Sequence, residues 1–185
     1  MRILAGSLGG RPFDQPKTTA VRPLSDKVRG AIFDMLGDIE GLVVLDVYAG
    51  SGAAGFEAAS RGASLVEAIE ASQPVARVIE SNARSLGLDW GYVLHVLNVE
   101  TWLALPSNQP APDGRLTRYD IIIADPPYVR IDADIMGRLA RLLNTGGVLV
   151  VSHSSKSPSP MLESGELVRQ KTYGDTALSI YKSGS

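Results

Sequence analysis

Short apolar runs alternate with amphipathic stretches along most of the chain, which is the pattern of a layered α/β protein. Because strands that are apolar at nearly every position are buried on both faces, these runs predict a parallel sheet with helices on each side. The predicted strands cover 42–47, 65–69, 92–97, 119–124, 148–152, 166–173 and 177–181. Apolar residues at helical spacing predict helices over 26–36, 53–61, 73–86, 99–105 and 133–143.

Polar residues and glycines mark the ends of these elements. Helix N-caps are expected at Ser25, Ser72 and Asp132. Residues 2–13 form a predicted β-hairpin around Gly9-Gly10. The predicted loops are 14–24, 106–118 and 153–162. Five β-α alternations followed by a β-rich end therefore predict a doubly wound, mostly parallel sheet.

The composition indicates one soluble globular domain of 185 residues, with 44% apolar and 21% charged residues. The apolar part of the N-terminus is too short for a signal peptide and no stretch approaches a membrane span, so we expect a cytoplasmic protein. The absence of cysteine excludes disulfides, thiolate zinc sites, cysteine-held iron–sulfur clusters and cysteine nucleophiles.

Positive charge is concentrated at the start of the chain. Residues 1–30 carry six Lys or Arg and two Asp, a net +4, so the remaining 155 residues carry −6. A basic segment on an acidic body is able to dock a phosphate backbone, although a solvated arm fits the charge equally well. The total of −2 argues against non-specific coating of nucleic acid.

Segment 43–55, VVLDVYAGSGAAG, is the centre of the predicted fold. Its apolar strand stops at Asp46, and the glycines that follow have the spacing of a strand that turns sharply into a helix beside a ligand. The order D-x-x-x-G-x-G is typical of S-adenosylmethionine pockets, whereas a nicotinamide dinucleotide fingerprint runs straight from strand to glycine. An acidic loop also suits the cationic end of S-adenosylmethionine better than a pyrophosphate.

Four predicted parallel strands stop at, or just before, a side chain that is able to bind a ligand: Asp46, Glu70, Asn98 and Asp125. Since such strands share one ligand-binding edge, these residues predict a single crevice. Glu70 is suited to accept hydrogen bonds from ribose hydroxyls, with a surface acid as the plainer reading. Asp46 alternatively holds amide groups of the glycine turn, and Asn98 is equally well a helix cap.

The motif Asp125-Pro126-Pro127-Tyr128 indicates the reaction. Its prolines fix the backbone and remove N–H donors, which leaves carbonyl acceptors beside a carboxylate. The Asp125 carboxylate and the Pro126 carbonyl are able to accept both hydrogens of a nucleobase amine and so direct its lone pair at a methyl group. Tyr128 is suited to stack on that base. The motif fits methylation of a base amine or a glutamine amide, with a rigid surface turn as the alternative.

Other conspicuous side chains are interpreted as structural. His95 is expected within a strand and His153 in a loop, and neither has neighbours in the sequence for a metal site or a triad. Trp90 and Trp102 are expected to be packing residues.

Over nearly its whole length the chain closely resembles the RsmD family, bacterial enzymes that methylate the N2 amine of a guanine in 16S ribosomal RNA. The matching segments are 2–6, 22–29, 32–33, 49–55, 57–58, 60–63, 125–128 and 173–176. Leu24, Lys27 and Gly30 depart from the usual Thr, Arg and Glu, and 9–12 is less basic than is usual.

The resemblance implies a seven-stranded, Rossmann-like class I S-adenosylmethionine methyltransferase fold with an N-terminal β-hairpin extension. It implies a hairpin and RNA-docking arm over 1–24 and a methyltransferase domain over 25–185. The implied cofactor is S-adenosylmethionine, and the implied partner of this monomer is 16S ribosomal RNA or a partly assembled small subunit, without metal or membrane.

The same resemblance implies the site residues. Contacts with S-adenosylmethionine fall to Asp46, Tyr48, Gly50, Gly52, Glu70, Ala71, Asn98 and Val99. The catalytic guanine site falls to Asp125, Pro126, Pro127 and Tyr128. Contacts with RNA fall to Arg2, Arg11, Arg22, Lys27 and Arg29.

Two other functions remain open. An adenine-N6 methyltransferase of DNA or RNA uses the same acceptor pair, although 185 residues leave no room for a separate DNA target-recognition domain. A non-catalytic RNA-binding or assembly factor would keep the pocket for stability alone, and the intact motif at 125–128 counts against it. Cytosine-C5 methylation through a cysteine adduct is excluded.

Overall fold

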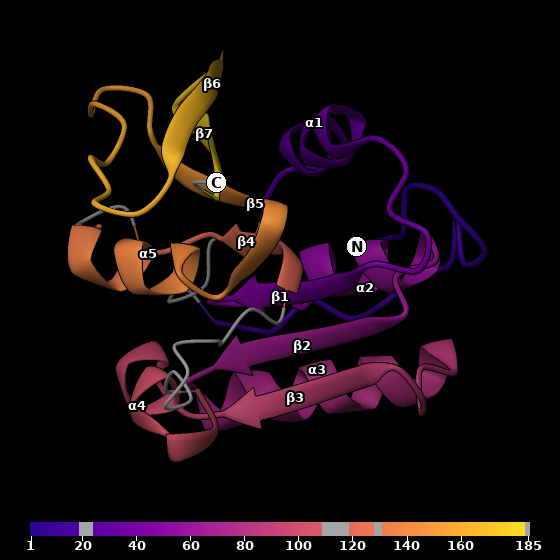
Figure 1. Cartoon of the computed structure of the whole chain (residues 1–185). Coiled ribbons are helices and arrows are strands. Elements are labelled where there is room, and N and C mark those ends of the chain that lie inside the picture. The colour runs from indigo at the N-terminus through magenta and orange to yellow at the C-terminus, as the bar shows by residue number, and fades with distance from the viewer. Residues whose placement is uncertain (19–23, 109–118, 128–130, 184–185) are drawn as a thin grey trace.

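The computed structural model describes residues 1–18, 24–108, 119–127 and 131–183. At its centre is a seven-stranded sheet in the order β3-β2-β1-β4-β5-β7-β6, parallel except that β7 runs antiparallel to β5 and β6 (Figure 1). The strands are β1 (Val43–Val47), β2 (Leu65–Glu70), β3 (Tyr92–Val96), β4 (Tyr119–Ala124), β5 (Leu143–Ser154), β6 (Glu166–Tyr173) and β7 (Thr176–Lys182). The predicted doubly wound, mostly parallel sheet is confirmed.

Helices cover both faces of the sheet. One face carries α1 (Asp26–Leu36), α2 (Ala53–Ser60) and α3 (Gln73–Leu86). The other carries α4 (Val99–Ala104), the 3-10 helix η1 (Pro106–Asn108) and α5 (Ala133–Ala140). Val44 packs in the core beneath α1, whereas Leu45 and Val47 pack beneath α4 and α5, as the alternation of a strand requires. No helix in the described ranges is long and apolar enough to cross a membrane.

The predicted helix caps hold in two cases of three. Ser25 and Asp132 accept hydrogen bonds from backbone N–H groups in the first turns of α1 and α5. Ser72 occupies the N-cap of α3, but its hydroxyl makes no capping bond, and its own N–H donates to the Glu70 carboxylate instead (2.7 Å).

Strand β5 is longer than predicted at both ends: it begins at Leu143 and includes Gly146 and Gly147, beside a register shift against β4, and it continues to Ser154. His153 therefore lies in a strand and not in a loop. Its side chain is fully buried, with Nε2 2.7 Å from the Ser179 hydroxyl.

The two tryptophans differ. Trp102 is 1% exposed and its ring lies 6.4 Å from that of Tyr119, so it is a packing residue as predicted. Trp90 is 93% exposed in the turn between α3 and β3, and the prediction that it packs is wrong. A large aromatic side chain alone does not indicate which side of a turn faces the protein.

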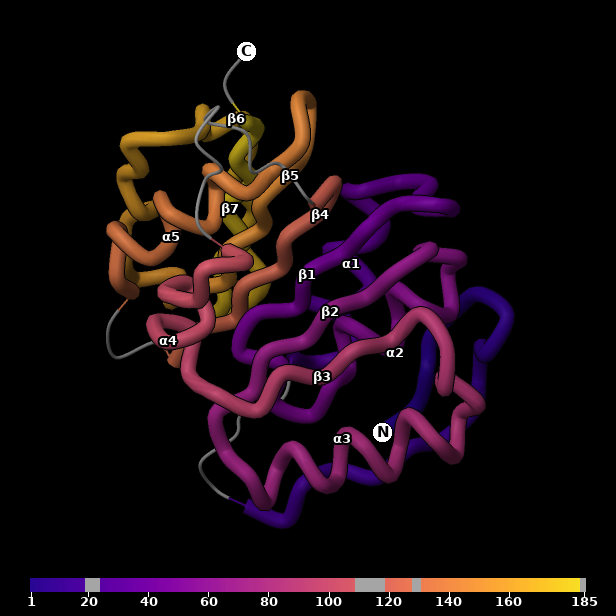
Figure 2. Tube along the Cα trace, turned by 60° about the horizontal axis from the view of Figure 1, so that its bottom comes forward, coloured from indigo at the N-terminus to yellow at the C-terminus, as the bar shows by residue number. Residues whose placement is uncertain are grey.

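Residues 1–13 form an arm that lies along α2 and α3 (Figure 2). The predicted hairpin is present in a short form: Arg2 and Pro12 form an antiparallel bridge, and backbone hydrogen bonds join residues 1–3 to residues 10–13. Ile3 and Phe13 are buried in the core shared with α2 and α3, so the arm is packed on the sheet domain. A domain boundary at residue 24 stays a prediction.

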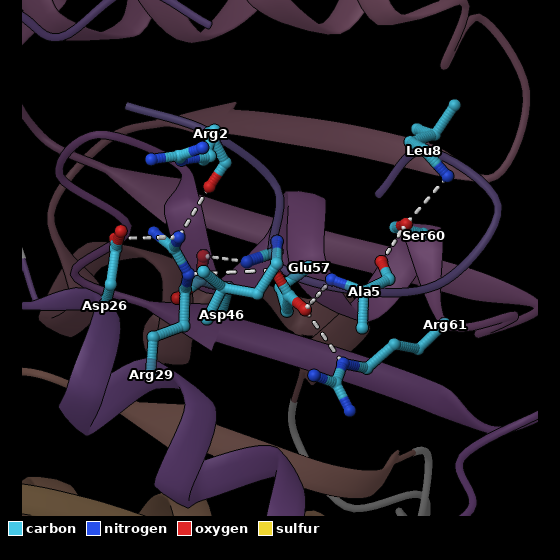
Figure 3. Close-up of polar contacts among 11 residues, drawn as sticks. Arg2, Ala5, Leu8, Asp26, Arg29, Asp46, Glu57, Ser60 and Arg61 are labelled. Carbon is cyan, nitrogen blue, oxygen red and sulfur yellow. Dashed lines mark hydrogen bonds and ion pairs between the residues drawn. The ribbon is translucent and has the colours of Figure 1, made fainter. Parts of the chain in front are cut away.

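The arm is held by the fully buried carboxylate of Glu57 in α2 (Figure 3). This carboxylate accepts hydrogen bonds from the N–H groups of Leu4 (2.8 Å) and Ala5 (3.0 Å). It also pairs with Arg61 at 2.9 Å and with Arg29 of α1 at 3.7 Å. One acidic side chain thus joins the arm, α1 and α2.

We expect Glu57→Ala to lower the free energy of unfolding by about 3–5 kcal/mol, because it leaves a buried guanidinium and two N–H groups without their carboxylate. Urea denaturation measures this change. The control is Glu80→Ala, since Glu80 makes an exposed pair with Arg84 at 3.9 Å, a type that contributes less than about 1 kcal/mol. Equal losses in both variants would contradict the anchoring role of Glu57.

Candidate active site

The glycine turn between β1 and α2 is held by two carboxylates. Asp46, which is 2% exposed, accepts a hydrogen bond from the Gly55 N–H (2.8 Å). Glu70, at the end of β2, accepts from the N–H groups of Gly50 (2.9 Å) and Ser72 (2.7 Å). Carboxylate oxygens have two lone pairs each, so both side chains keep acceptor capacity for a ligand.

The backbone of the turn is strained at a residue that is not a glycine, which the glycine pattern does not predict. Tyr48 has φ +62°, and it is the one non-glycine residue with positive φ in the described ranges. Such a conformation costs on the order of 1–3 kcal/mol and is concentrated at functional sites. A Cβ on Gly52 (φ +76°) would lie 2.8 Å from the Phe56 ring, so this glycine permits close packing of the turn on α2.

Asn98 is the helix cap that was one of its two predicted roles, and its contact with the cofactor stays a prediction. Its side-chain oxygen accepts a hydrogen bond from the Thr101 N–H (2.7 Å) as the N-cap of α4. The residue also lines the cavity described below.

Residues 125–127 continue directly from β4 toward the end of β1. The Asp125 N–H donates to the Val47 carbonyl (3.2 Å), which ties the segment to the neighbouring strand. The Ser152 hydroxyl, from β5, donates to the Asp125 carboxylate. Tyr128, predicted to stack on a base, lies outside the described residues.

A cavity of about 580 Å³ opens at the carboxyl ends of β1, β2 and β4, where the strand order reverses direction. The predicted residues that line it are Asp46, Tyr48, Gly50, Glu70, Ala71, Asn98, Val99, Asp125, Pro126 and Pro127. Gly52, a predicted cofactor contact, is absent from this lining. In the described part of the chain, no group of three or more His, Asp or Glu side chains is placed to hold a metal ion.

The cavity is acidic. Its carboxylates are Asp46, Glu70, Glu100, Asp125 and Asp175, and the described lining contains no Lys, Arg or His. Burial raises the pKa of Asp46 to about 7, a rise opposed by the Gly55 N–H and reinforced by Asp125 and Glu70. Burial, with smaller contributions from nearby acids, also raises the pKa of Tyr48 to about 12. A cationic ligand relieves this repulsion, whereas a pyrophosphate would increase it.

One predicted RNA contact is contradicted by the structure. The Arg29 side chain is 0% exposed, and its guanidinium donates to the Arg2 carbonyl (2.6 Å) and to Asp26 (3.0 Å) (Figure 3). Burial lowers its pKa, partly offset by Asp26 and Glu57. Arg29 is therefore an internal structural cation that RNA cannot reach.

The other predicted RNA contacts differ in their surroundings. Arg11 donates to two backbone carbonyls in the last turn of α3, at 2.6 and 3.0 Å, which is the role of a C-terminal helix cap. Arg2 and Lys27 are exposed. Arg22 lies outside the described residues.

The model of a protein family described as "Conserved hypothetical protein 95" matches residues 1–182. YlbH of Bacillus subtilis is 32% identical over 188 residues, with 98% of both chains covered. "Ribosomal RNA small subunit methyltransferase D" of Escherichia coli K12 is 28% identical over 190 residues, covering 98% of this chain and 89% of the relative. The chain belongs to this family, the RsmD family.

Solved structures agree with this assignment. The yhhF methyltransferase from Escherichia coli has a TM-score of 0.83 at 28% identity, over 99% of this chain and 97% of that one. A protein from Thermus thermophilus has a TM-score of 0.79 at 31% identity, over 97% and 98%. SMU.776, solved in complex with SAH, has a TM-score of 0.62 over 84% of this chain and 48% of that one, but at 17% identity this likeness concerns the fold alone. The predicted Rossmann-like class I methyltransferase fold is confirmed.

Reasoning from single motifs missed two segments that line the cavity of this RsmD-family chain. These segments are the start of α1 and the β6–β7 turn, which line the cavity through Leu24, Ser25, Val28, Tyr173, Asp175 and Thr176. The sequence signal for both is the family resemblance at 22–29 and 173–176. Ser152 carried no signal, because its contact with Asp125 depends on the pairing of β4 with β5.

We expect stability to fall as the pH rises from about 4 to about 7, because Asp46 binds its proton more tightly in the folded protein than in the unfolded chain, where its pKa is 3.8. At pH 8 the loss is on the order of 4 kcal/mol. Asp46→Asn keeps an acceptor for the Gly55 N–H and removes this titration. Urea denaturation of both proteins across this pH range measures the difference, and parallel stability curves would contradict the raised pKa.

Proposed function

We propose that this RsmD-family methyltransferase transfers a methyl group from S-adenosylmethionine to the exocyclic N2 amine of a guanine in 16S ribosomal RNA. The relatives in Escherichia coli and Haemophilus influenzae are named ribosomal RNA small subunit methyltransferases, which supports an rRNA substrate. The family resemblance at 125–128 supports the guanine amine.

One observation carries the proposal: the amine-binding segment 125–127 lines the same acidic cavity as Asp46 and Glu70. S-adenosylmethionine fits this cavity because its sulfonium and ammonium outweigh its one carboxylate, and because its ribose has two hydroxyls. The acidic side chains of the cavity supply the countercharge, and Glu70 has unused lone pairs for the ribose.

Different residues of the cavity would contact different parts of the cofactor. Of the residues that line the cavity, Glu70 would hold the ribose, Asn98 and Val99 would contact the adenine, and the acidic turn that begins at Asp46 would hold the amino acid end. When bound, the cofactor supplies a methyl group already activated by its attachment to a sulfonium.

The protein's task is then to position the amine. The Asp125 carboxylate and the Pro126 carbonyl accept the two amine hydrogens, which localises the nitrogen lone pair. Ser152 and the Val47 carbonyl fix Asp125 from the two neighbouring strands. Such positioning is a large part of catalysis for a substrate whose leaving group is already good.

A direct experiment incubates the protein with labelled S-adenosylmethionine and either naked 16S RNA or small subunits from a strain that lacks the activity. Mass spectrometry of the digested RNA then identifies the product. N2-methylguanine is the expected result. N6-methyladenine would replace the proposal by the adenine alternative, and cofactor binding without transfer would favour a non-catalytic assembly factor.

Asp125→Ala is expected to abolish transfer while cofactor affinity stays within about tenfold, since the ribose and amino acid contacts lie elsewhere. Calorimetry with the demethylated cofactor measures binding, and label incorporation measures transfer. Asp134→Ala, an exposed acid on α5, is the control and should behave as the native protein. Loss of cofactor binding in Asp125→Ala would mean that the two halves of the site are misassigned.

Ser152→Ala should reduce kcat by about tenfold, because an Asp125 that loses a donor is less well oriented. Cofactor affinity and KM for RNA should be unchanged, and Ser152→Thr, which keeps the hydroxyl, should restore part of the rate. A fall in cofactor affinity that parallels the fall in kcat would assign Ser152 a structural role only.

A further inference from the structure

A second cavity, of about 520 Å³, lies between α1 and the edge strand β6. Its cationic side chains are Lys27 from α1 and Arg169 and Lys171 from β6. All three are exposed, and none makes an ion pair within the described residues. We call this cavity, with its three cations, the α1–β6 groove.

The α1–β6 groove leads to the mouth of the candidate active site. Tyr173, the last residue of β6, lines both cavities. On the opposite wall, Ser25 lines the active site and the next two residues, Asp26 and Lys27, line the groove. If one unit of a polymer enters the active site, the neighbouring units can therefore lie in the groove between α1 and β6.

The two cavities have opposite charge character. The active-site lining has five carboxylates and no described cation, so it repels a phosphate chain. In the groove, Asp26 is already paired with Arg29 at 3.0 Å, which leaves Asp34 as the acid opposed to three cations. A nucleic acid whose base enters the first cavity has its phosphates attracted into the second.

The spacing of the cations suits a chain of phosphates. Arg169 and Lys171 are two residues apart on one face of β6, about 7 Å along the strand. Every residue from Glu166 to Thr172 is exposed, so both side chains are accessible to a partner. Cations of this kind contact the backbone and set register without reading sequence.

We propose that the α1–β6 groove binds the phosphate backbone of the substrate RNA next to the methylated base. The proposal rests on the proposed function for its partner. Edge strands also carry Lys and Arg merely to prevent aggregation, and this plainer role gives no specific effect on RNA binding.

The decisive variant is Arg169→Glu combined with Lys171→Glu. Filter binding to a 16S ribosomal RNA transcript should weaken at least about tenfold, and the slope of log K against log salt should become less steep by about 1.4, the value for two lost phosphate contacts on a single strand. Calorimetry should give unchanged affinity for the demethylated cofactor. A thermal unfolding scan establishes that the variant is folded.

Two further variants test the sign and the place of the effect. Asp34→Lys, on the α1 wall, should strengthen RNA binding by about threefold or more, because it replaces the groove's acid by a cation. Arg77 is an exposed cation on α3, which α2 separates from α1 (Figure 1). Arg77→Glu should therefore change RNA binding by less than the groove variants.

The outcomes of these experiments test the groove proposal and the proposed reaction separately. Native affinity and salt slope in the double variant overturn the groove proposal, even if methyl transfer to ribosomal RNA stands. A loss confined to assembled small subunits, with naked RNA bound normally, also overturns it in favour of a protein contact. Groove-dependent RNA binding without any transfer by the native protein supports the groove and rejects the proposed reaction.

Discussion

The position of the candidate active site depends on the interactions of one buried carboxylate, that of Glu57. It holds the N-terminal arm through two backbone N–H groups and holds α1 through Arg29. The start of α1 lines the candidate active site, and α1 from Asp26 to Met35 lines one wall of the α1–β6 groove. Desolvation of a buried ion pair costs free energy, and in this protein the pair fixes the position of a helix that lines both cavities. The family resemblance at 22–29 thus includes residues with no route to a ligand, such as Arg29.

Much of the site follows from strand ends. Asp46, Glu70, Asn98 and Asp125 are expected at one edge because the carboxyl ends of parallel strands meet there, and the cavity contains all four. That inference needs only the order of elements along the chain. It is insensitive to errors of a few residues in their bounds, such as the early start of β5.

What could not be predicted depends on contacts between distant segments. A count of charges places Arg29 with the other cations of the N-terminal segment, but its partner Glu57 lies 28 positions further along and turns it inward. Arg169 and Lys171 read as ordinary surface residues until the strand order places β6 opposite α1. Gly52 has the spacing of a ligand-binding glycine, yet the Phe56 ring is what excludes a side chain there.

The proposed function requires one small domain to bind two ligands of opposite sign, and the separation of charge accounts for how it would do so. A cavity acidic enough to attract a cationic methyl donor repels the phosphates of the RNA that must be methylated. Neutralising the cavity would weaken the donor's binding, and a basic lining would admit phosphates in its place. Cations in an adjoining groove meet both requirements. They would attract the phosphate backbone to the far side of Tyr173, which lines both cavities, while the base alone enters the acidic cavity. Under the two proposals, the acidic cavity and the basic groove together orient the substrate.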